Sequence, residues 1–228
     1  MPTHFRTGVS NQVPGNPLFQ LPYLDPTKYT TYFNDFLTYH ADEWTITTTE
    51  ALTSGPGGWL LITNDDADDD LDFLQLKGEA FKYVSTKNMF FKARFKVSDA
   101  TQSDFVMGLG ITDTTPLDTT DGVFFIKADG AATMDFLIEK DNSATTNSSV
   151  ATISDDTFLT ASFHYNPNGG SSGGGAFEVF IDDSKVATET TLTNAPDDED
   201  LTVSFGIQNG AAAAKTMTVD YIFAAVER

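Results

Sequence analysis

Short segments of alternating apolar and polar residues follow one another from residue 29 to the end of the chain, separated by turns rich in Gly, Asn, Asp and Thr. The alternation is clear in the last segment, where one face of an extended strand would carry Met217, Val219, Tyr221 and Phe223. Side chains alternate between the two faces of a β-strand, so this pattern predicts strands with one buried face. A chain that ends on such a strand is expected to have its end held in a sheet.

Strand candidates occur at the spacing that is typical of a β-sandwich. They span residues 29–36, 44–48, 58–63, 71–76, 89–97, 105–111, 122–127, 134–140, 158–165, 176–182, 184–192, 201–208 and 216–226. A chain of 228 residues is long enough for a full core, and sandwiches of this size often form one domain. The sequence therefore predicts an all-β protein whose main domain, residues 29–228, is an antiparallel β-sandwich.

Residues 1–28 differ in composition and are expected to form an extended N-terminal arm, because their five prolines disfavour a helix. The arm is also apolar, and its candidate contact residues are Phe5, Val13, Leu18, Phe19, Leu21, Tyr23 and Leu24. Two fates are open for it. The arm could lie along its own sandwich, or it could dock on a neighbouring subunit.

The net charge of −20, from 33 acidic and 13 basic residues, argues against nucleic acid and anionic membranes as partners, since both would be repelled. The chain contains no Cys, which excludes disulfides and thiolate metal sites. Its N-terminus lacks the apolar run of a secretory signal, and no segment has the ~18 apolar residues of a membrane span. The chain is therefore expected to be made in a cytoplasm and to stay soluble.

Three basic residues, Lys92, Arg94 and Lys96, alternate with apolar residues in one strand candidate and should share one face. Two interpretations are open. The cations could pair with carboxylates on neighbouring strands, or they could form a contact patch for an acidic partner.

An acidic segment at residues 64–72 is the one candidate for metal binding. Its carboxylates at Asp65, Asp66, Asp68, Asp69 and Asp70 are hard oxygen ligands of the kind that Ca²⁺ prefers, although the spacing is not that of an EF-hand. A solvated acidic loop without a metal is the alternative. No other cofactor is expected.

Several strand motifs occur in an order that resembles the concanavalin-A-like jelly roll of lectins, laminin G-type modules and many virion proteins. After a strand at Trp44 they are Gly58-Trp-Leu-Leu-Ile-Thr63, Lys92-Ala-Arg-Phe-Lys-Val97, Val106-Met-Gly-Leu-Gly110, Gly122-Val-Phe-Phe-Ile126, Phe177-Glu-Val-Phe-Ile-Asp182, Phe205-Gly-Ile-Gln-Asn209 and Val219-Asp-Tyr-Ile222. The resemblance covers residues 29–228.

The apolar arm and the acidic, Cys-free sandwich look most like tailed-bacteriophage proteins that decorate or cement a capsid. This resemblance implies a structural protein on the outer surface of a virion, made in the host cytoplasm. Its partner would be the major capsid protein, and it would form a symmetric homo-oligomer, with a trimer favoured.

Catalysis is not expected from the sequence. Glycoside hydrolases on this fold place carboxylates on one strand face in a Glu-x-Asp-x-x-Glu pattern, which this chain lacks. The nearest pairs are Asp135 with Glu139 and Glu178 with Asp182, and an outward polar row explains both. The histidines, His4, His40 and His164, lie far apart without a nucleophile or ligand spacing.

The alternative function is that of a lectin-like module that binds surface glycans. Trp59, Tyr83 and Tyr165 are the aromatic residues that could form a platform for a sugar ring. Both tryptophans lie inside strand patterns, however, where a buried anchor is the commoner role.

Overall fold

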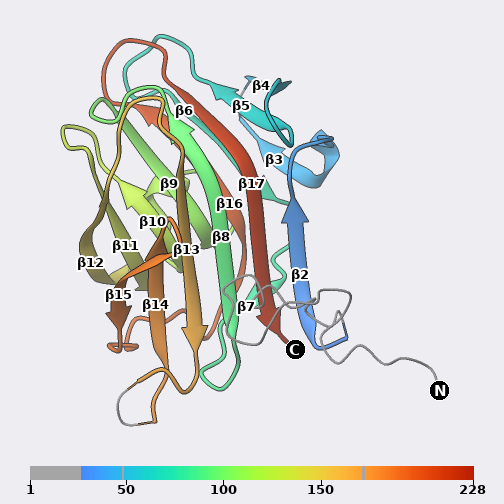
Figure 1. Cartoon of the computed structure of the whole chain (residues 1–228), viewed down its shortest axis with the longest axis vertical. Helices are drawn as coiled ribbons and strands as arrows, with labels where there is room; N and C mark the ends of the chain where they lie inside the picture. Colours follow the sequence, from blue (N-terminus) through green and yellow to red (C-terminus); the bar gives the residue numbers. More distant parts are fainter. Residues whose placement is uncertain (1–26, 48, 171–172) are drawn as a thin grey trace.

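A computed structural model describes residues 27–47, 49–170 and 173–228. The chain folds into two eight-stranded antiparallel sheets packed face to face, as Figure 1 shows. This confirms the predicted all-β sandwich of the concanavalin-A-like jelly-roll type. The arm residues from Phe5 to Leu24 lie outside the described residues.

The sheet nearer the viewer in Figure 1 is called the front sheet. Its strand order is β15-β14-β13-β8-β17-β5-β4, and β2 also pairs with β17. The strands are β2 (Tyr29–Asn34), β4 (Thr49–Thr53), β5 (Trp59–Thr63), β8 (Met89–Val97), β13 (Leu159–Asn166), β14 (Ala176–Ile181), β15 (Ser184–Glu189) and β17 (Thr216–Glu227).

The second sheet is called the back sheet, and its order is β12-β11-β10-β9-β16-β6-β3, with β7 also paired to β16. Its strands are β3 (Trp44–Ile46), β6 (Leu71–Leu76), β7 (Phe81–Lys82), β9 (Ser103–Gly110), β10 (Gly122–Lys127), β11 (Thr133–Lys140), β12 (Ser143–Thr152) and β16 (Asp200–Asn209). Two short 3₁₀ helices, η2 (Ala41–Glu43) and η3 (Pro116–Asp118), lie in connections.

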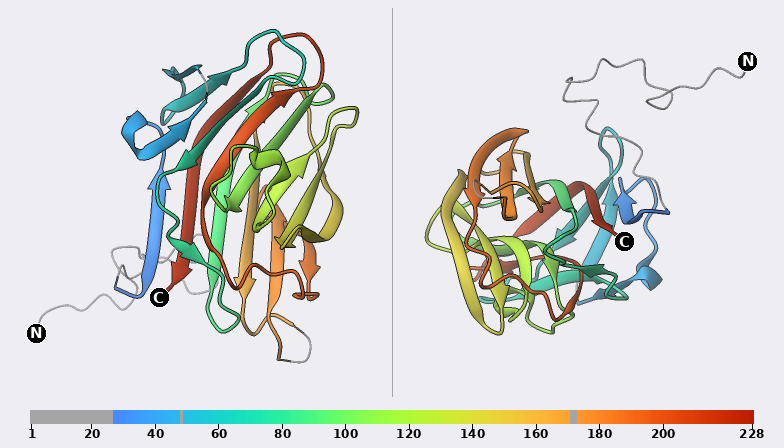
Figure 2. Two further views of the ribbon diagram at one scale, coloured as in Figure 1. Left: turned by 180° about the vertical axis from the view of Figure 1, so that it is seen from behind. Right: turned by 90° about the horizontal axis from the view of Figure 1, so that it is seen from below.

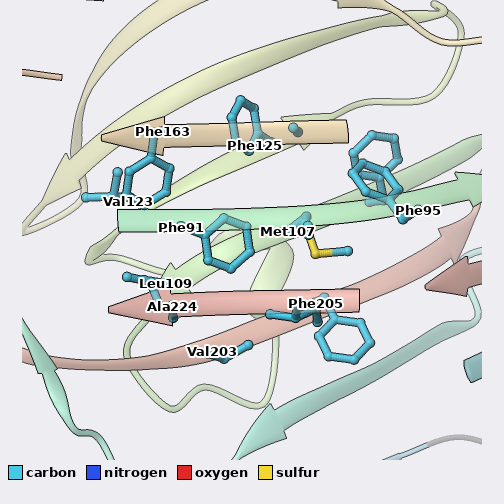
Figure 3. Close-up of a cluster of buried hydrophobic side chains, with 14 of the residues drawn as sticks. Phe91, Phe95, Met107, Leu109, Val123, Phe125, Phe163, Val203, Phe205 and Ala224 are labelled. Atoms are coloured by element: carbon cyan, nitrogen blue, oxygen red, sulfur yellow. The ribbon is translucent and has the colours of Figure 1, made fainter. Parts of the chain in front are cut away.

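The core lies between the sheets and is rich in phenylalanine, as Figure 3 shows. Phe91 and Phe95 of β8 point inward with Phe163 of β13, and Phe125 of β10 meets them from the back sheet. Each buried side chain of this size contributes ~1.5–3 kcal/mol through the hydrophobic effect. The core supplies stability that this chain cannot obtain from disulfides.

The last strand contains a β-bulge that corrects the predicted facing of its residues. Val219 lies opposite Phe95, but the pairing shifts at Asp220, so Tyr221 lies opposite Arg94 and Phe223 opposite Lys92. Because a bulge inserts one extra residue, every following side chain changes face. Met217 and Val219 are buried as predicted, whereas Tyr221 and Phe223 face outward with the basic residues.

Three strands were not predicted: β4, β7 and β12. The largest is β12, ten residues made mostly of Ser, Thr and Asn, which pairs with β11. Two hairpins have two-residue turns in which both residues have positive φ, Asp141-Asn142 and Asp182-Asp183. This geometry matches the twist of paired strands, and it confirms the tight hairpin expected at residues 181–186.

Candidate functional site

The outer face of the back sheet is partly covered by residues 111–121, the connection between β9 and β10. This segment lies in front of the sheet in the left view of Figure 2. The buried side chain of Gln75 holds the start of this segment. The side-chain nitrogen of Gln75 donates to the Ile111 carbonyl at 3.2 Å, and the side-chain oxygen of Gln75 accepts from the backbone amide of Asp113 at 3.1 Å. Pro116 of η3 packs onto the sheet near Gly108 and Phe124.

A hollow of about 240 Å³ opens beside this connection. It is lined by Asp104, Leu117, Ile126, Lys127, Ala128, Asp135 and Gln208. Strand register places these residues together: Gln208 of β16 pairs with Asp104 of β9, and Ile126 of β10 pairs with Asp135 of β11. The hollow therefore spans four neighbouring strands, with η3 contributing Leu117 to its rim.

Two carboxylates line the hollow, and each already accepts one backbone hydrogen bond. The Asp129 amide donates to Asp104 at 2.9 Å, and the Ser149 amide donates to Asp135 at 2.6 Å. Burial raises the pKa of Asp104, and the negative charges of Asp129 and Asp69 act in the same direction. A carboxyl whose pKa is shifted in a hollow is a common feature of functional sites.

Lys127 is the one cationic side chain that lines this hollow, and it is only 1% exposed. Its ammonium group donates to the Ser103 carbonyl and, at 2.9 Å, to the Ala128 carbonyl. Burial lowers the pKa of Lys127, while the carboxylates of Asp104, Asp129 and Asp99 oppose that shift. The donors of Lys127 are therefore directed at the protein's own carbonyls.

The predicted basic row forms on the outer face of the front sheet, and each member has an acidic partner. Lys92 pairs with Asp183 at 2.5 Å, Arg94 pairs with Asp220, and Lys96 pairs with Asp156 at 3.1 Å. The guanidinium of Arg94 also lies over the Phe158 ring. Of the two interpretations, the structure favours charge pairing on the sheet surface.

The acidic loop is held mainly through its backbone. The Asn209 amide donates to the carbonyls of Asp65 and Ala67, and the carboxylate of Asp70 accepts the Asp65 amide at 2.7 Å. Asp66, Asp68 and Asp69 are exposed. Within the described ranges, no three His, Cys, Asp or Glu side chains gather as a metal site.

The aromatic platform proposed for a lectin does not form. Tyr83 and Tyr165 are buried in the core, with ring centroids 4.8 Å apart. Burial raises the pKa of Tyr83, as expected for a phenol inside a core. Trp59 is half-buried against Phe158. Any glycan site must therefore use other residues.

Of the two carboxylate pairs considered for catalysis, only Asp135 reaches the hollow. Glu139 lies on the same strand, and burial raises its pKa, as do nearby Asp118 and Asp121. Glu178 is bound to Lys185 at 2.6 Å on the other sheet. Sequence reasoning missed Asp104 and Gln208, because they reach Asp135 only through the successive pairings of β16 with β9, β9 with β10 and β10 with β11.

His164 is held between aromatic and polar neighbours on the front sheet. Its ring stacks on Phe90 at 4.3 Å, its Nε2 lies 3.0 Å from the Asn88 side-chain oxygen, and its Nδ1 lies 3.5 Å from Glu178. Burial lowers its pKa. Both ring nitrogens of His164 thus have a polar neighbour within the protein.

Comparison with known proteins places this chain in a fold class but in no family. No protein-family model matches the sequence, and a search of curated proteins found no match. Solved structures do match. The carbohydrate recognition domain of Emp47p is 12% identical in sequence and has a TM-score of 0.62. The alignment covers 89% of this chain and 98% of the Emp47p domain.

An endo-1,3-β-glucanase from Streptomyces sioyaensis is equally similar in structure. It is 12% identical in sequence and has a TM-score of 0.62, and the alignment covers 88% of this chain and 97% of the glucanase chain. The prediction that this chain is not an enzyme is contradicted by this neighbour, because the same jelly roll carries a glycosidase.

One neighbour bears on the prediction of a metal ion. The carbohydrate recognition domain of Emp46p was solved in a potassium-bound form. It is 11% identical in sequence and has a TM-score of 0.56, and the alignment covers 84% of this chain and 94% of the Emp46p domain. A metal ion is thus compatible with this fold, and the Ca²⁺ site at residues 65–70 stays a prediction. None of these three neighbours is a virion protein, so capsid decoration has no support from them.

Proposed function

We propose that this protein binds carbohydrate in the hollow on the outer face of the back sheet. The observation that carries the proposal is the lining of that hollow, where carboxylate and amide groups lie beside apolar side chains. A sugar ring presents hydroxyls that donate and accept hydrogen bonds, and it also has apolar C–H faces. Asp104, Asp135 and Gln208 suit the hydroxyls, whereas Leu117 and Ile126 suit the C–H faces.

The size and charge of the hollow limit the ligand. Its volume of about 240 Å³ is below the ~300–1,000 Å³ of most ligand pockets, so it fits a single sugar unit of a longer chain. Two carboxylates on a molecule with a net charge of −20 repel polyuronates. The ligand class is therefore a neutral or amino-sugar oligosaccharide. The two carbohydrate recognition domains and the glucanase with this fold support a carbohydrate ligand in general.

Isothermal titration with β-1,3-glucan, β-1,4-glucan, glucosamine and glucuronate oligosaccharides tests this proposal. We expect binding of a neutral or amino-sugar oligomer, and a loss of at least tenfold in affinity, about 1.4 kcal/mol, in Asp135→Asn and Gln208→Ala. Asp42→Asn is the matched control, because Asp42 is exposed on η2. Binding to none of the oligomers, or equal affinity in all variants, would overturn the proposal.

Hydrolysis of a bound glycan is a second candidate, and the two carboxyl groups in one hollow favour it. Glycosidases need one carboxyl that donates a proton and one that acts as base or nucleophile, and a raised pKa suits Asp104 to the first role. Incubation with the bound oligomer should then release reducing ends. Asp104→Asn should abolish the release, whereas intact oligomer after incubation with the wild type would exclude hydrolysis.

A further inference from the structure

The outer face of the front sheet carries several phenylalanine side chains that lie outside the core. Strand pairing aligns Phe33, Phe223, Lys92, Ser162 and Phe180 in one row across β2, β17, β8, β13 and β14. The adjacent row contains Thr31, Ala225, Phe90, His164 and Glu178. These two rows are called the aromatic face.

No segment within the described ranges crosses the aromatic face, which is turned toward the viewer in Figure 1. The back sheet differs, because residues 111–121 cover part of its outer face in Figure 2. Phe33 is 61% exposed, and Leu37, just beyond β2, is 65% exposed. The bulge at Asp220 is what turns Tyr221 and Phe223 to this side. An uncovered apolar area of this kind usually marks an interaction surface.

The charges on this face cancel, although the chain as a whole carries −20. Each basic side chain here is bound to a carboxylate: Lys92 to Asp183, Arg94 to Asp220, Lys96 to Asp156 and Lys185 to Glu178. Two copies of the chain repel one another wherever acidic surfaces meet. The aromatic face is where they can approach without that repulsion.

The aromatic face and the ion-paired residues that flank it on the same strands together have the size of a dimer interface. Five strands ~4.8 Å apart and nine residues of β8 at ~3.3 Å each give roughly 20 by 30 Å, or ~600 Å² in projection. The accessible area of a ridged surface exceeds its projection, and a stable interface buries ~800 Å² on each partner. Aromatic side chains are enriched in the centres of such interfaces.

The polar groups here are poor ligands for a glycan. The ring nitrogens of His164 face Asn88 and Glu178, and the ammonium of Lys92 is bound to Asp183. Few donors and acceptors remain for sugar hydroxyls, whereas an apolar protein surface needs none. A sheet face that meets its own copy forms a two-fold interface, because the same residues are contributed by both chains.

We infer that the aromatic face is a self-association surface that joins two copies of this chain, sheet against sheet, around a two-fold axis. This inference is independent of the proposed carbohydrate site, which lies on the opposite sheet. It also differs from the trimer implied by the virion resemblance, since one self-complementary patch makes a dimer.

Sedimentation velocity of the full chain from 1 to 100 µM tests the inference. We expect the wild type to sediment as a dimer, and Phe33→Glu to weaken the dimer at least 100-fold. Ser162→Glu should do the same, because it places a charge in the middle of the row without removing a core contact. Leu52→Glu is the matched control: Leu52 is 47% exposed on the same sheet, but it lies opposite the buried Leu60 and so points to the other face.

Circular dichroism establishes that each variant is folded. A wild type that is monomeric at 100 µM would overturn the inference, as would equal dissociation in the Leu52 control and the two face variants. A monomer that binds a polysaccharide through Phe33 would also overturn it. The inference would also be overturned if the full chain were monomeric and only a chain lacking residues 1–26 dimerised, because the arm would then be the group that covers the face.

Discussion

Asp104, one of the proposed glycan ligands, is a side chain whose ionised form weakens the fold. Burial is the main cause of its raised pKa, so the folded chain resists ionisation of this carboxyl. Ionisation therefore costs stability as the pH rises through the raised pKa, and the cost vanishes below the pKa of the unfolded chain. A residue that weakens the fold at neutral pH is often kept for function.

Asp104→Asn should therefore raise Tm at pH 7. Near pH 3 it should leave Tm unchanged, because the Asp104 carboxyl is then protonated in both the folded and the unfolded chain. The amide oxygen of asparagine can still accept the hydrogen bond from the Asp129 amide. Thermal unfolding across this pH range checks the prediction. Asp42→Asn, which removes the same charge from an exposed site, measures the general effect of net charge. A lower Tm for Asp104→Asn at pH 7 would contradict the account.

The sequence identified individual site residues only in part. Asp135 was considered with Glu139 but was set aside as part of an outward polar row, and the other residues of the hollow were not considered. Asp104 and Gln208 join it through pairings between β9, β10, β11 and β16, and contacts across a sheet leave no local signal in one sequence. The aromatic candidates failed for a similar reason, because alternation alone does not reveal that Tyr83 and Tyr165 meet inside the core.

Elements with a clear apolar alternation were predicted well, and those without it were missed. β8 alternates strictly and folds as expected, whereas β12 is almost entirely polar because it lies at the edge of the back sheet. The bulge at Asp220 was also invisible, since Tyr221 and Phe223 keep the alternation of the preceding residues. Only the pairing of β17 with β8 shows that these rings face outward.

The close approach of β9 and β10 gives a prediction at the level of elements. A Cβ added at Gly108 would lie 2.5 Å from the Phe124 Cα and from the Val123 carbonyl oxygen. Gly108→Ala should therefore destabilise the protein by about 2 kcal/mol, as overpacking does when backbone must shift. Denaturant unfolding measures it. Gly174→Ala, at a position with open space, should stay within about 0.5 kcal/mol, and equal effects would contradict the argument.

At the scale of the whole molecule, the acidic charge is distributed over a surface with few basic partners. The ion pairs on the outer faces, such as Lys140 with Asp197 and Lys82 with Asp200, are exposed and contribute little each. Self-repulsion of a chain with a net charge of −20 therefore outweighs them. No helix among the described residues is long and apolar enough to span a membrane.

Salt should accordingly stabilise this protein. Raising NaCl from 20 to 500 mM shortens the Debye length from ~20 Å to ~4 Å, which screens repulsion between distant carboxylates more than contacts within ion pairs. We expect Tm to rise by several degrees, as measured by differential scanning calorimetry at pH 7. A fall in Tm with salt would mean that the ion pairs dominate.

The central claim is that a glycan binds in the hollow of the back sheet, and amide chemical-shift mapping by NMR tests it most directly. Titration of the wild-type chain with a neutral or glucosamine oligomer should shift the resonances of Asp104, Leu117, Ile126, Asp135 and Gln208, and leave those of Phe33, Phe90 and Phe180 unchanged. Shifts confined to the aromatic face, or no shifts with any oligomer, would contradict the claim.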